Sequence, residues 1–435
     1  MTAGPRRRAW LARALVGGGL VTASYALAQP PEIVRYQHLG PAACASSVCH
    51  GKIAPQPGRN VGLNEYRIWL QDDLHSRAYK VLEQPLSRRI AANMGIGNPT
   101  SEKICLDCHS DNVPLNRRGP KFQLNDGIGC EACHGGAEKW IENHASETRA
   151  HKDNVAQGMY PSEQPLQRAA LCLSCHLGNK DKYTTHLIMG AGHPRLSFEL
   201  EAYTTNQPSH FTVDADYTRR KGKIDGVNLW LTGQIESARS ILLLQQSELF
   251  HPPGMFPEIA LYDCHSCHHP MDQPRWTPAH AGPGIKAGTL RLQIQNLVIL
   301  QAVLGRIEPG ARDELTIMTN ALVRAGQRDV ETVKTAAGVL LEWLKTREGL
   351  SRRAFSRAEV VEVRKSLLGY GASDKVGDYA VAEQIVLGVE SLSYSVGDRV
   401  AKKPLLDKLY AAVKSGTNFS PTQFSAAAKA ALGRF

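Results

Sequence analysis

Apolar residues recur at helical spacing in the last third of the chain and predict helices there. Spacings of three and four residues mark one helix near residues 290–304 and another near 330–344. Ser356 and Glu359 have the spacing of a capping box, which indicates a further helix start. Five to seven helices in about 150 residues favour an antiparallel bundle over residues 285–435.

The preceding part of the chain has a different pattern. Between residues 38 and 280, proline and glycine clusters are frequent and strand patterns are sparse, which indicates a loop-rich helical structure. One long apolar periodicity predicts a single helix from Val227 to Phe250. The Ala-His-Ala-Gly-Pro-Gly segment at 279–284 predicts a linker. The fold class is therefore mainly α, with a loop-rich domain over residues 29–284 followed by the bundle.

Residues 1–28 have the pattern of a secretory signal peptide. Four arginines precede a short apolar stretch, which ends in Ala-Leu-Ala before Gln29. Three consecutive glycines interrupt the apolar stretch and favour a cleaved signal over a retained membrane anchor. No later window approaches the roughly 18 apolar residues that span a bilayer. We therefore expect a mature periplasmic protein without a transmembrane segment.

The composition is that of an ordinary globular protein, with 42% hydrophobic and 21% charged residues, but it includes ten cysteines and sixteen histidines. All ten cysteines form five close pairs, and each pair is followed at once by a histidine. We number these motifs one to five in chain order: Cys44, Cys49 and His50; Cys105, Cys108 and His109; Cys130, Cys133 and His134; Cys172, Cys175 and His176; Cys264, Cys267 and His268.

Motifs two to five have the C-x-x-C-H spacing that attaches c-type haem. Two thiols form thioethers with the porphyrin, and the adjoining histidine supplies an axial imidazole to the iron. Disulfides within the pairs or zinc ribbons would leave the five following histidines without a role. The first motif has four residues between Cys44 and Cys49, and a structural disulfide is its alternative. The sequence thus predicts five haems c, or four if that disulfide forms.

Bis-histidine haems need a second histidine on the other side of the iron. All sixteen histidines lie between residues 38 and 280, so we expect several of those outside the motifs to be ligands. Ten are candidates: His38, His75, His144, His151, His186, His193, His210, His251, His269 and His280. Sequence context favours His75, on a predicted amphipathic helix, His144, which follows a glycine turn, and His193, in a glycine- and proline-containing loop.

These motifs resemble the multihaem cytochrome c-554 family over roughly residues 38–200. The matching features are the His75 segment, the third motif with its Gly-Gly turn and His144, and the fourth motif with His193 downstream. The resemblance implies that His193 ligates the haem of His50, that His75 ligates the haem of His134, and that His144 ligates the haem of His176. It also implies that the haem of His109 has an open or weakly held sixth position.

The chain departs from the family in its widened first motif, its fifth motif and its long haem-free tail. The family therefore supplies no second ligand for the haem of His268. His210 and His186 are the candidates for it, with His251 and His269 behind them.

The formal charge of +10 does not indicate a nucleic-acid partner. Removal of residues 1–28 takes away four arginines and no acidic residue, which leaves +6. Each ferric haem adds roughly one negative charge through its propionates, so the holoprotein is close to neutral.

Two functions are consistent with this sequence. Closely spaced haems with many spare histidines favour an electron carrier between periplasmic redox partner proteins over a catalyst. The alternative is a haem enzyme that reduces or oxidises a small nitrogen or sulfur oxide at the haem of His109. The C-terminal helices either stabilise the cytochrome or provide a docking or dimerisation surface.

Overall fold

The computed structural model describes residues 33–56, 61–146, 148–251, 257–269, 289–414, 416 and 418–435. The predicted signal peptide and the predicted linker at 279–284 lie outside these residues. Within them the chain is helical apart from its loops, and β-structure is limited to isolated bridges. The prediction of a mainly α fold is confirmed. None of the described helices combines the length and the apolar character of a membrane span.

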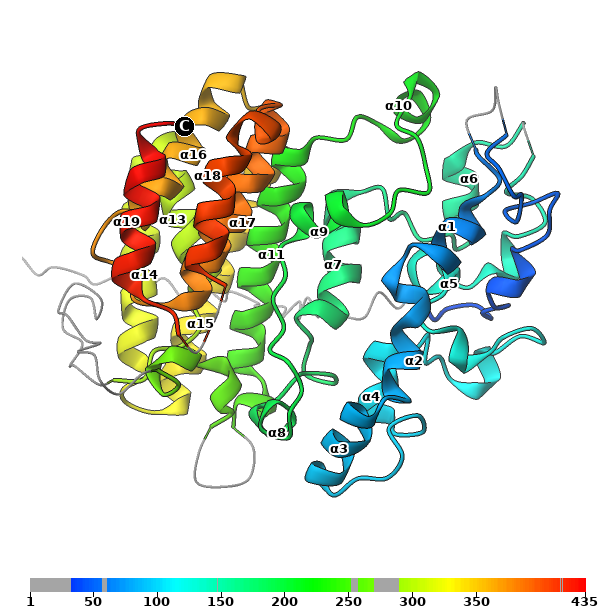
Figure 1. Cartoon of the computed structure of the whole chain (residues 1–435), viewed down its shortest axis with the longest axis horizontal. Coiled ribbons are helices and arrows are strands. Elements are labelled where there is room, and N and C mark those ends of the chain that lie inside the picture. The colour runs from blue at the N-terminus through cyan, green and yellow to red at the C-terminus, as the bar shows by residue number, and fades with distance from the viewer. Residues whose placement is uncertain are drawn as a thin grey trace, which may run out of the picture.

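Short helices and long loops form the N-terminal part (Figure 1). Its α-helices are α1 (Glu65–Gln71), α2 (Ala78–Leu82), α3 (Pro85–Met94), α4 (Lys103–His109), α5 (Cys130–His134), α6 (His151–Ala156), α7 (Pro165–His176), α8 (His186–Gly190), α9 (Leu200–Asn206) and α10 (Ala215–Lys221). Single turns of 3-10 helix separate them: η1 (Pro41–Ala43), η2 (Leu74–Arg77), η3 (Leu115–Arg117), η4 (Leu124–Asp126) and η5 (Ala137–Lys139).

Longer helices form the C-terminal bundle. They are α11 (Gly226–Gln246), α13 (Gln295–Ile307), α14 (Pro309–Ala325), α15 (Val330–Lys345), α16 (Arg357–Gly371), α17 (Tyr379–Val396), α18 (Arg399–Ala412) and α19 (Pro421–Leu432). The predicted helices near 290–304 and 330–344 correspond to α13 and α15. Ser356 and Glu359 form the predicted capping box at the start of α16. The remaining 3-10 turns are η6 (Glu248–Phe250), η7 (Ile259–Leu261), η8 (Cys264–Ser266) and η9 (Glu348–Arg352).

Helix α11 belongs to the bundle although it precedes the predicted linker. It packs against α13, α15 and α17 on one side and against α7 and α9 on the other. In Figure 1 it runs through the middle of the molecule, between the N-terminal helices and the rest of the bundle. The sequence predicted this helix as far as Phe250, but α11 ends at Gln246 and a short 3-10 turn follows.

The two parts differ in how they bury apolar side chains. Every buried residue of the large hydrophobic cluster comes from Val227 or later. A second, small cluster joins α7 and α9 to α11 through Ala169, Leu173, Leu200 and Leu229. In the N-terminal part, several large apolar side chains face outward: Ile53 is 86% exposed and Val48 is 80% exposed. Among its described residues, the buried apolar side chains of the N-terminal part outside this small cluster are scattered and form no hydrophobic cluster of their own.

The segment around His75 is not the continuous helix that the sequence predicted. Helix α1 ends at Gln71, and His75 lies on η2 before α2 begins. The carboxylate of Asp73 accepts a hydrogen bond from the backbone N–H of His75 and so caps this new turn. An aspartate at this position interrupts the helix because its side chain competes for the backbone donors.

Candidate haem sites

Helix ends position three of the five motif histidines. His109, His134 and His176 are the last residues of α4, α5 and α7, so each motif forms the final turn of its helix. His50 instead lies in the loop after η1, as the wider spacing of its cysteines requires, and the fifth motif begins on η8. All ten cysteines are free thiols, including Cys44 and Cys49.

Each motif histidine faces one further histidine. The ring centroids of His50 and His144 lie 6.0 Å apart. The other pairs are His75 with His176 at 6.1 Å, His109 with His193 at 6.3 Å, His134 with His210 at 6.1 Å, and His186 with His268 at 6.2 Å. The five second histidines are all different. They are the five that the sequence analysis favoured, two of them as alternatives for the fifth motif.

The separation within the pairs is suited to one metal ion between two imidazoles. A metal–imidazole bond is about 2 Å long and the ring centre lies about 1 Å behind the nitrogen, so two rings on opposite sides of one metal have centroids about 6 Å apart. All five pairs have this separation. With two thiols beside each motif histidine, each pair fits the donor set of haem c.

Hydrogen bonds at Nδ1 leave Nε2 available in five of these ten histidines. Carboxylates bind two of them: Glu65 Oε2 lies 2.8 Å from His50 Nδ1, and Asp73 Oδ1 lies 2.8 Å from His75 Nδ1. Backbone carbonyls lie beside Nδ1 of three more histidines. The carbonyl of Ala78 is 3.0 Å from His109, that of Ile141 is 2.6 Å from His144, and that of Pro194 is 2.8 Å from His193. A partner at Nδ1 fixes the tautomer and the orientation of a ligating imidazole.

Burial and these partners also set the protonation of the rings. Desolvation lowers the pKa of His134 to about 3 and lowers the pKa of His176 and His210. These imidazoles are neutral at pH 7, which is the form that binds a metal. The hydrogen bonds that His50 and His75 donate to Glu65 and Asp73 instead raise the pKa of the two histidines. A more basic imidazole is a stronger ligand to ferric iron.

The pairs differ from those that the resemblance implied. His193 faces His109 rather than His50, His75 faces His176 rather than His134, and His144 faces His50 rather than His176. The site at His109, expected to be open, therefore has a histidine opposite it.

Contacts between motifs explain why the histidine pairs differ from those that the resemblance implied. The side chains of Cys44 and Cys130 lie next to each other, so the first and third motifs are adjacent and the segment after the third motif, which holds His144, lies beside the first. The side chains of Cys108 and Cys175 are likewise adjacent, so the segment before α2, which packs on the second motif through α4, places His75 beside the fourth motif.

Other histidines have different partners. His38 is fully buried between Asp111 and the carbonyl of Ile33. His151 pairs with Glu163, and His265 points to the carbonyl of Gly416. His251 and His269 are not among the five facing pairs, and His280 lies outside the described residues.

The carboxylates Glu65 and Asp73 were missed in the sequence. Asp73 is two residues from His75, so its proximity was a usable signal. Glu65 is fifteen residues from His50, and only the fold brings the two together.

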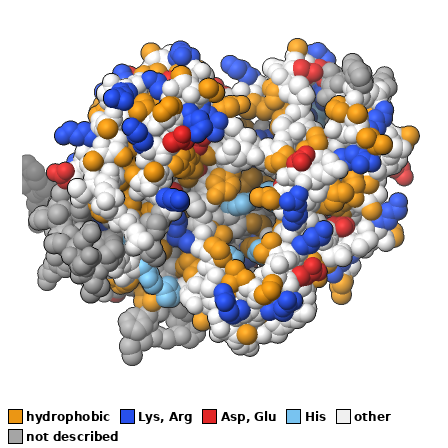
Figure 2. All heavy atoms as spheres, viewed as in Figure 1, with side chains coloured by type: hydrophobic (Ala, Val, Ile, Leu, Met, Phe, Trp, Pro, Cys, Tyr) orange, Lys and Arg blue, Asp and Glu red, His pale blue; other side chains and the backbone are white. Residues whose placement is uncertain are grey.

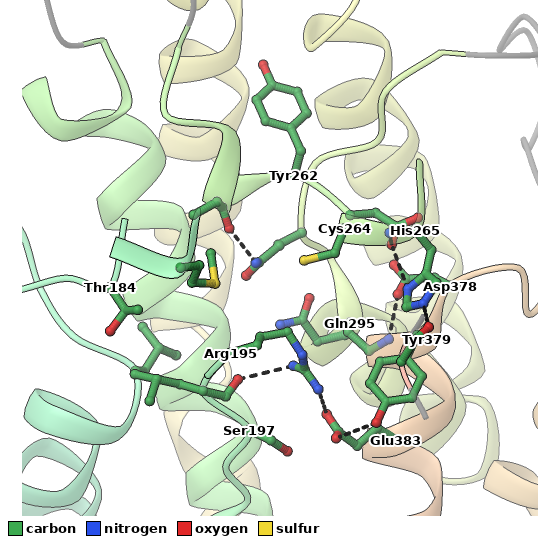
Figure 3. A pocket seen from close by; sticks show the side chains of 18 of the residues that line it. Thr184, Arg195, Ser197, Tyr262, Cys264, His265, Gln295, Asp378, Tyr379 and Glu383 are labelled. Carbon is green, nitrogen blue, oxygen red and sulfur yellow. Dashed lines mark hydrogen bonds and ion pairs between the residues drawn. The ribbon is translucent and has the colours of Figure 1, made fainter. Parts of the chain in front are cut away.

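The fifth motif opens onto a cavity of about 640 Å³, within the usual size range of cofactor sites. Figure 3 shows the sulfur of Cys264 pointing into this cavity. His186 and His268 line it, and so does His176 of the fourth motif. In the space-filling view, histidine and hydrophobic side chains lie together in the hollow between the two parts of the molecule (Figure 2).

Comparison with known protein families gave a match over the part of the chain that contains the first three motifs. Residues 43–135 match the family described as cytochrome c554 and c-prime. This cytochrome c554-like region holds motifs one to three and covers less than a quarter of the chain. The resemblance stated from the sequence is confirmed over this shorter stretch. The cytochrome c554-like region is that of a c-type cytochrome, and its cofactor is haem c. Comparison with curated proteins and with solved structures gave no match.

Proposed function

We propose that this chain is a periplasmic electron carrier with five haems c, each held between a motif histidine and a second histidine. The five facing pairs of histidines carry this proposal, because each motif histidine has one partner at the separation that a shared iron requires. A haem with two histidine ligands is low-spin and exchanges electrons without binding a substrate at the iron.

The arrangement of the motifs supports a continuous route for electrons. The side chains of Cys44 and Cys130 adjoin each other, as do those of Cys108 and Cys175, so the first motif lies beside the third and the second beside the fourth. Cys133 of the third motif lies close enough to Cys172 and Cys175 of the fourth to interact with them electrostatically. His176 of the fourth motif lines the cavity of the fifth. Haems attached at these positions lie close to one another, so electrons can hop between them.

The enzyme alternative loses its main support. It depended on an open coordination position at the haem of His109, and His193 faces that histidine with its ring centroid 6.3 Å away. The export pattern of residues 1–28 supports the periplasm as the compartment, where thioether attachment of haem takes place, and redox proteins there are the expected partners.

Spectroscopy of the exported holoprotein tests this proposal. Pyridine haemochrome analysis together with intact mass should give five haems per chain. Electron paramagnetic resonance of the oxidised protein should show low-spin ferric haem alone, and carbon monoxide should leave the visible spectrum of the reduced protein unchanged. A high-spin ferric signal, or a carbon monoxide adduct on one haem, would show an open coordination position and would support the enzyme alternative instead. Four haems together with a Cys44–Cys49 disulfide would show that the first motif holds no haem.

A further inference from the structure

We propose that the C-terminal bundle forms half of the binding site of the fifth haem, although it supplies no ligand to the iron. The inference rests on the proposed attachment of haem to the fifth motif. It assigns a function to residues 289–435, which contain neither cysteine nor histidine.

The cavity of the fifth motif lies between the two parts of the molecule. The N-terminal part contributes Leu173, His176, Met189 and Phe198, among others. The bundle contributes a largely polar wall that includes Ser237 of α11, Gln295 and Asn296 of α13, and Tyr379, Glu383 and Gln384 of α17, with the small Ala380 beside Tyr379. A group that fills the cavity therefore touches both parts.

The bundle also holds the fifth motif itself. The carboxylate of Asp263 caps η8 and accepts a hydrogen bond of 3.1 Å from Arg291, which precedes α13. His265, inside the motif, lines the cavity and is held against the bundle, because its ring nitrogen contacts the carbonyl of Gly416 and its ring packs against Tyr379 and Phe419. Asp263 and His265 are both buried. These contacts fix Cys264 against the bundle with its thiol facing the cavity, as Figure 3 shows.

Contacts between α17 and the segment from Arg195 to Phe198 border another side of the cavity. Arg195 forms an ion pair of 2.7 Å with Glu383, and its guanidinium lies 5.0 Å from the centre of the Tyr379 ring (Figure 3). The next residue on α17, Gln384, donates a 3.0 Å hydrogen bond to the carbonyl of Phe198, three residues after Arg195. Phe198 stacks on His176 with ring centroids 4.6 Å apart. Helix α17 thus positions the wall shared by the fourth and fifth sites.

One unpartnered atom indicates that the cavity is filled in the complete protein. The side-chain oxygen of Gln295 is buried and has no hydrogen-bond partner among the described residues. It belongs to a residue that lines the cavity. Buried polar atoms in folded proteins almost always have a partner, so this oxygen is placed for a hydrogen-bond donor that the described residues do not provide, such as a protonated haem propionate or a water molecule bound beside the haem.

The first test enlarges a bundle side chain that lines the cavity, so that less room is left for haem. In the full-length exported protein, Ala380→Trp places a large side chain on the cavity wall at a position outside the fifth motif. We expect it to lose the fifth haem and keep four, as measured by intact mass and by peptide mapping of residues 257–269. Ala401→Trp, at an exposed position near the start of α18, is the matched control and should keep five haems.

A charge substitution gives an independent readout. Glu383→Gln removes a negative charge from the wall and should raise the midpoint potential of a single haem, because the reduced haem carries one more negative charge than the oxidised haem. Glu362→Gln, in an exposed ion pair with Arg306, should leave all potentials unchanged. If the Ala380→Trp protein does not accumulate in cells, the midpoint potentials of the Glu383→Gln and Glu362→Gln proteins test the role of the bundle.

The outcomes separate this inference from the proposed function. Wild-type protein with haem on four motifs and a free fifth motif would overturn the fifth haem itself. Wild-type and Ala380→Trp proteins that both carry five haems, with potentials unchanged in Glu383→Gln, would overturn the role of the bundle and leave the electron carrier intact.

Discussion

At the scale of single residues, carboxylates beside two of the histidines tune the sites. Asp73 is buried, and burial alone would oppose its ionisation. Hydrogen bonds from His75 and from the side chain of Gln207 nevertheless lower the pKa of Asp73 to about 2. The carboxylate is therefore ionised at pH 7 and strengthens the donor character of the imidazole that it contacts.

Substitution of Asp73 should change one haem potential. Asp73→Asn removes the negative charge beside His75, so the ferric state of the haem between His75 and His176 loses stabilisation. We expect its midpoint potential to rise by on the order of tens of millivolts, since a tenfold change in equilibrium corresponds to about 59 mV for one electron. Potentiometric titration measures this shift. The neighbouring exposed Asp72→Asn is the control, and an equal shift in both variants would contradict the assignment.

Residue types and close spacing made the motifs predictable, whereas the pairing was not. Two cysteines and a histidine act together within five to seven residues, so the sequence alone identifies them. The partner of His50 is 94 residues away, and the adjacency of the first and third motifs, whose Cys44 and Cys130 lie side by side, brings it close. Such a contact depends on how distant loops pack, which no local pattern records. That these pairs bind iron stays a proposal.

At the scale of elements, the junction of α9 with α17 carries two buried carboxyl groups. Glu199 accepts hydrogen bonds from the backbone N–H groups of Glu201 and Ala202 and from the hydroxyl of Ser391. Burial raises its pKa to about 7. Burial and the neighbouring Glu199 raise the pKa of Glu201 to about 8. The junction is therefore most stable with its carboxyl groups protonated.

This pair should make the folded state less stable as the pH rises. Unfolded glutamates lose their protons near pH 4.5, but these two keep theirs to about pH 7 and 8 when folded, so the folded state binds more protons between those values. The free energy of unfolding should thus fall between about pH 5 and pH 8. In Glu201→Gln the fall should be smaller, by on the order of 1–3 kcal/mol.

Denaturant titrations followed by circular dichroism at both pH values measure this difference. Glu331→Gln, at an exposed position on α15, should keep the wild-type pH dependence. An unchanged fall in Glu201→Gln would show that other groups cause it.

Helix prediction succeeded where one apolar face repeats and failed where a side chain intervenes. Helices α13 and α15 follow their apolar spacing, and Ser356 caps α16 as predicted. The His75 segment has similar spacing, but Asp73 caps a new turn inside it. The packing of α11 against both parts could not be predicted from its own sequence, because it depends on which distant helices contact its two sides.

At the scale of the whole molecule, two different interiors lie side by side. The bundle has a continuous core of apolar side chains from Val227 onward. The N-terminal part leaves large apolar side chains such as Ile53 and Val48 exposed. In the holoprotein we expect haem to cover such side chains. The two parts should therefore depend on haem attachment to different degrees.

Expression without a haem-attachment system should separate these parts. Without covalently bound haem the N-terminal part lacks its core, so limited proteolysis should degrade it while the holoprotein resists, much as metal-dependent domains unfold without their metal. The bundle should persist as a resistant fragment. Because Trp230, Leu231 and Leu242 of α11 belong to the bundle core, this fragment should begin before residue 226 rather than near 285. Mass spectrometry of the fragment decides between these boundaries, and a resistant N-terminal part in the haem-free protein would contradict the account of its core.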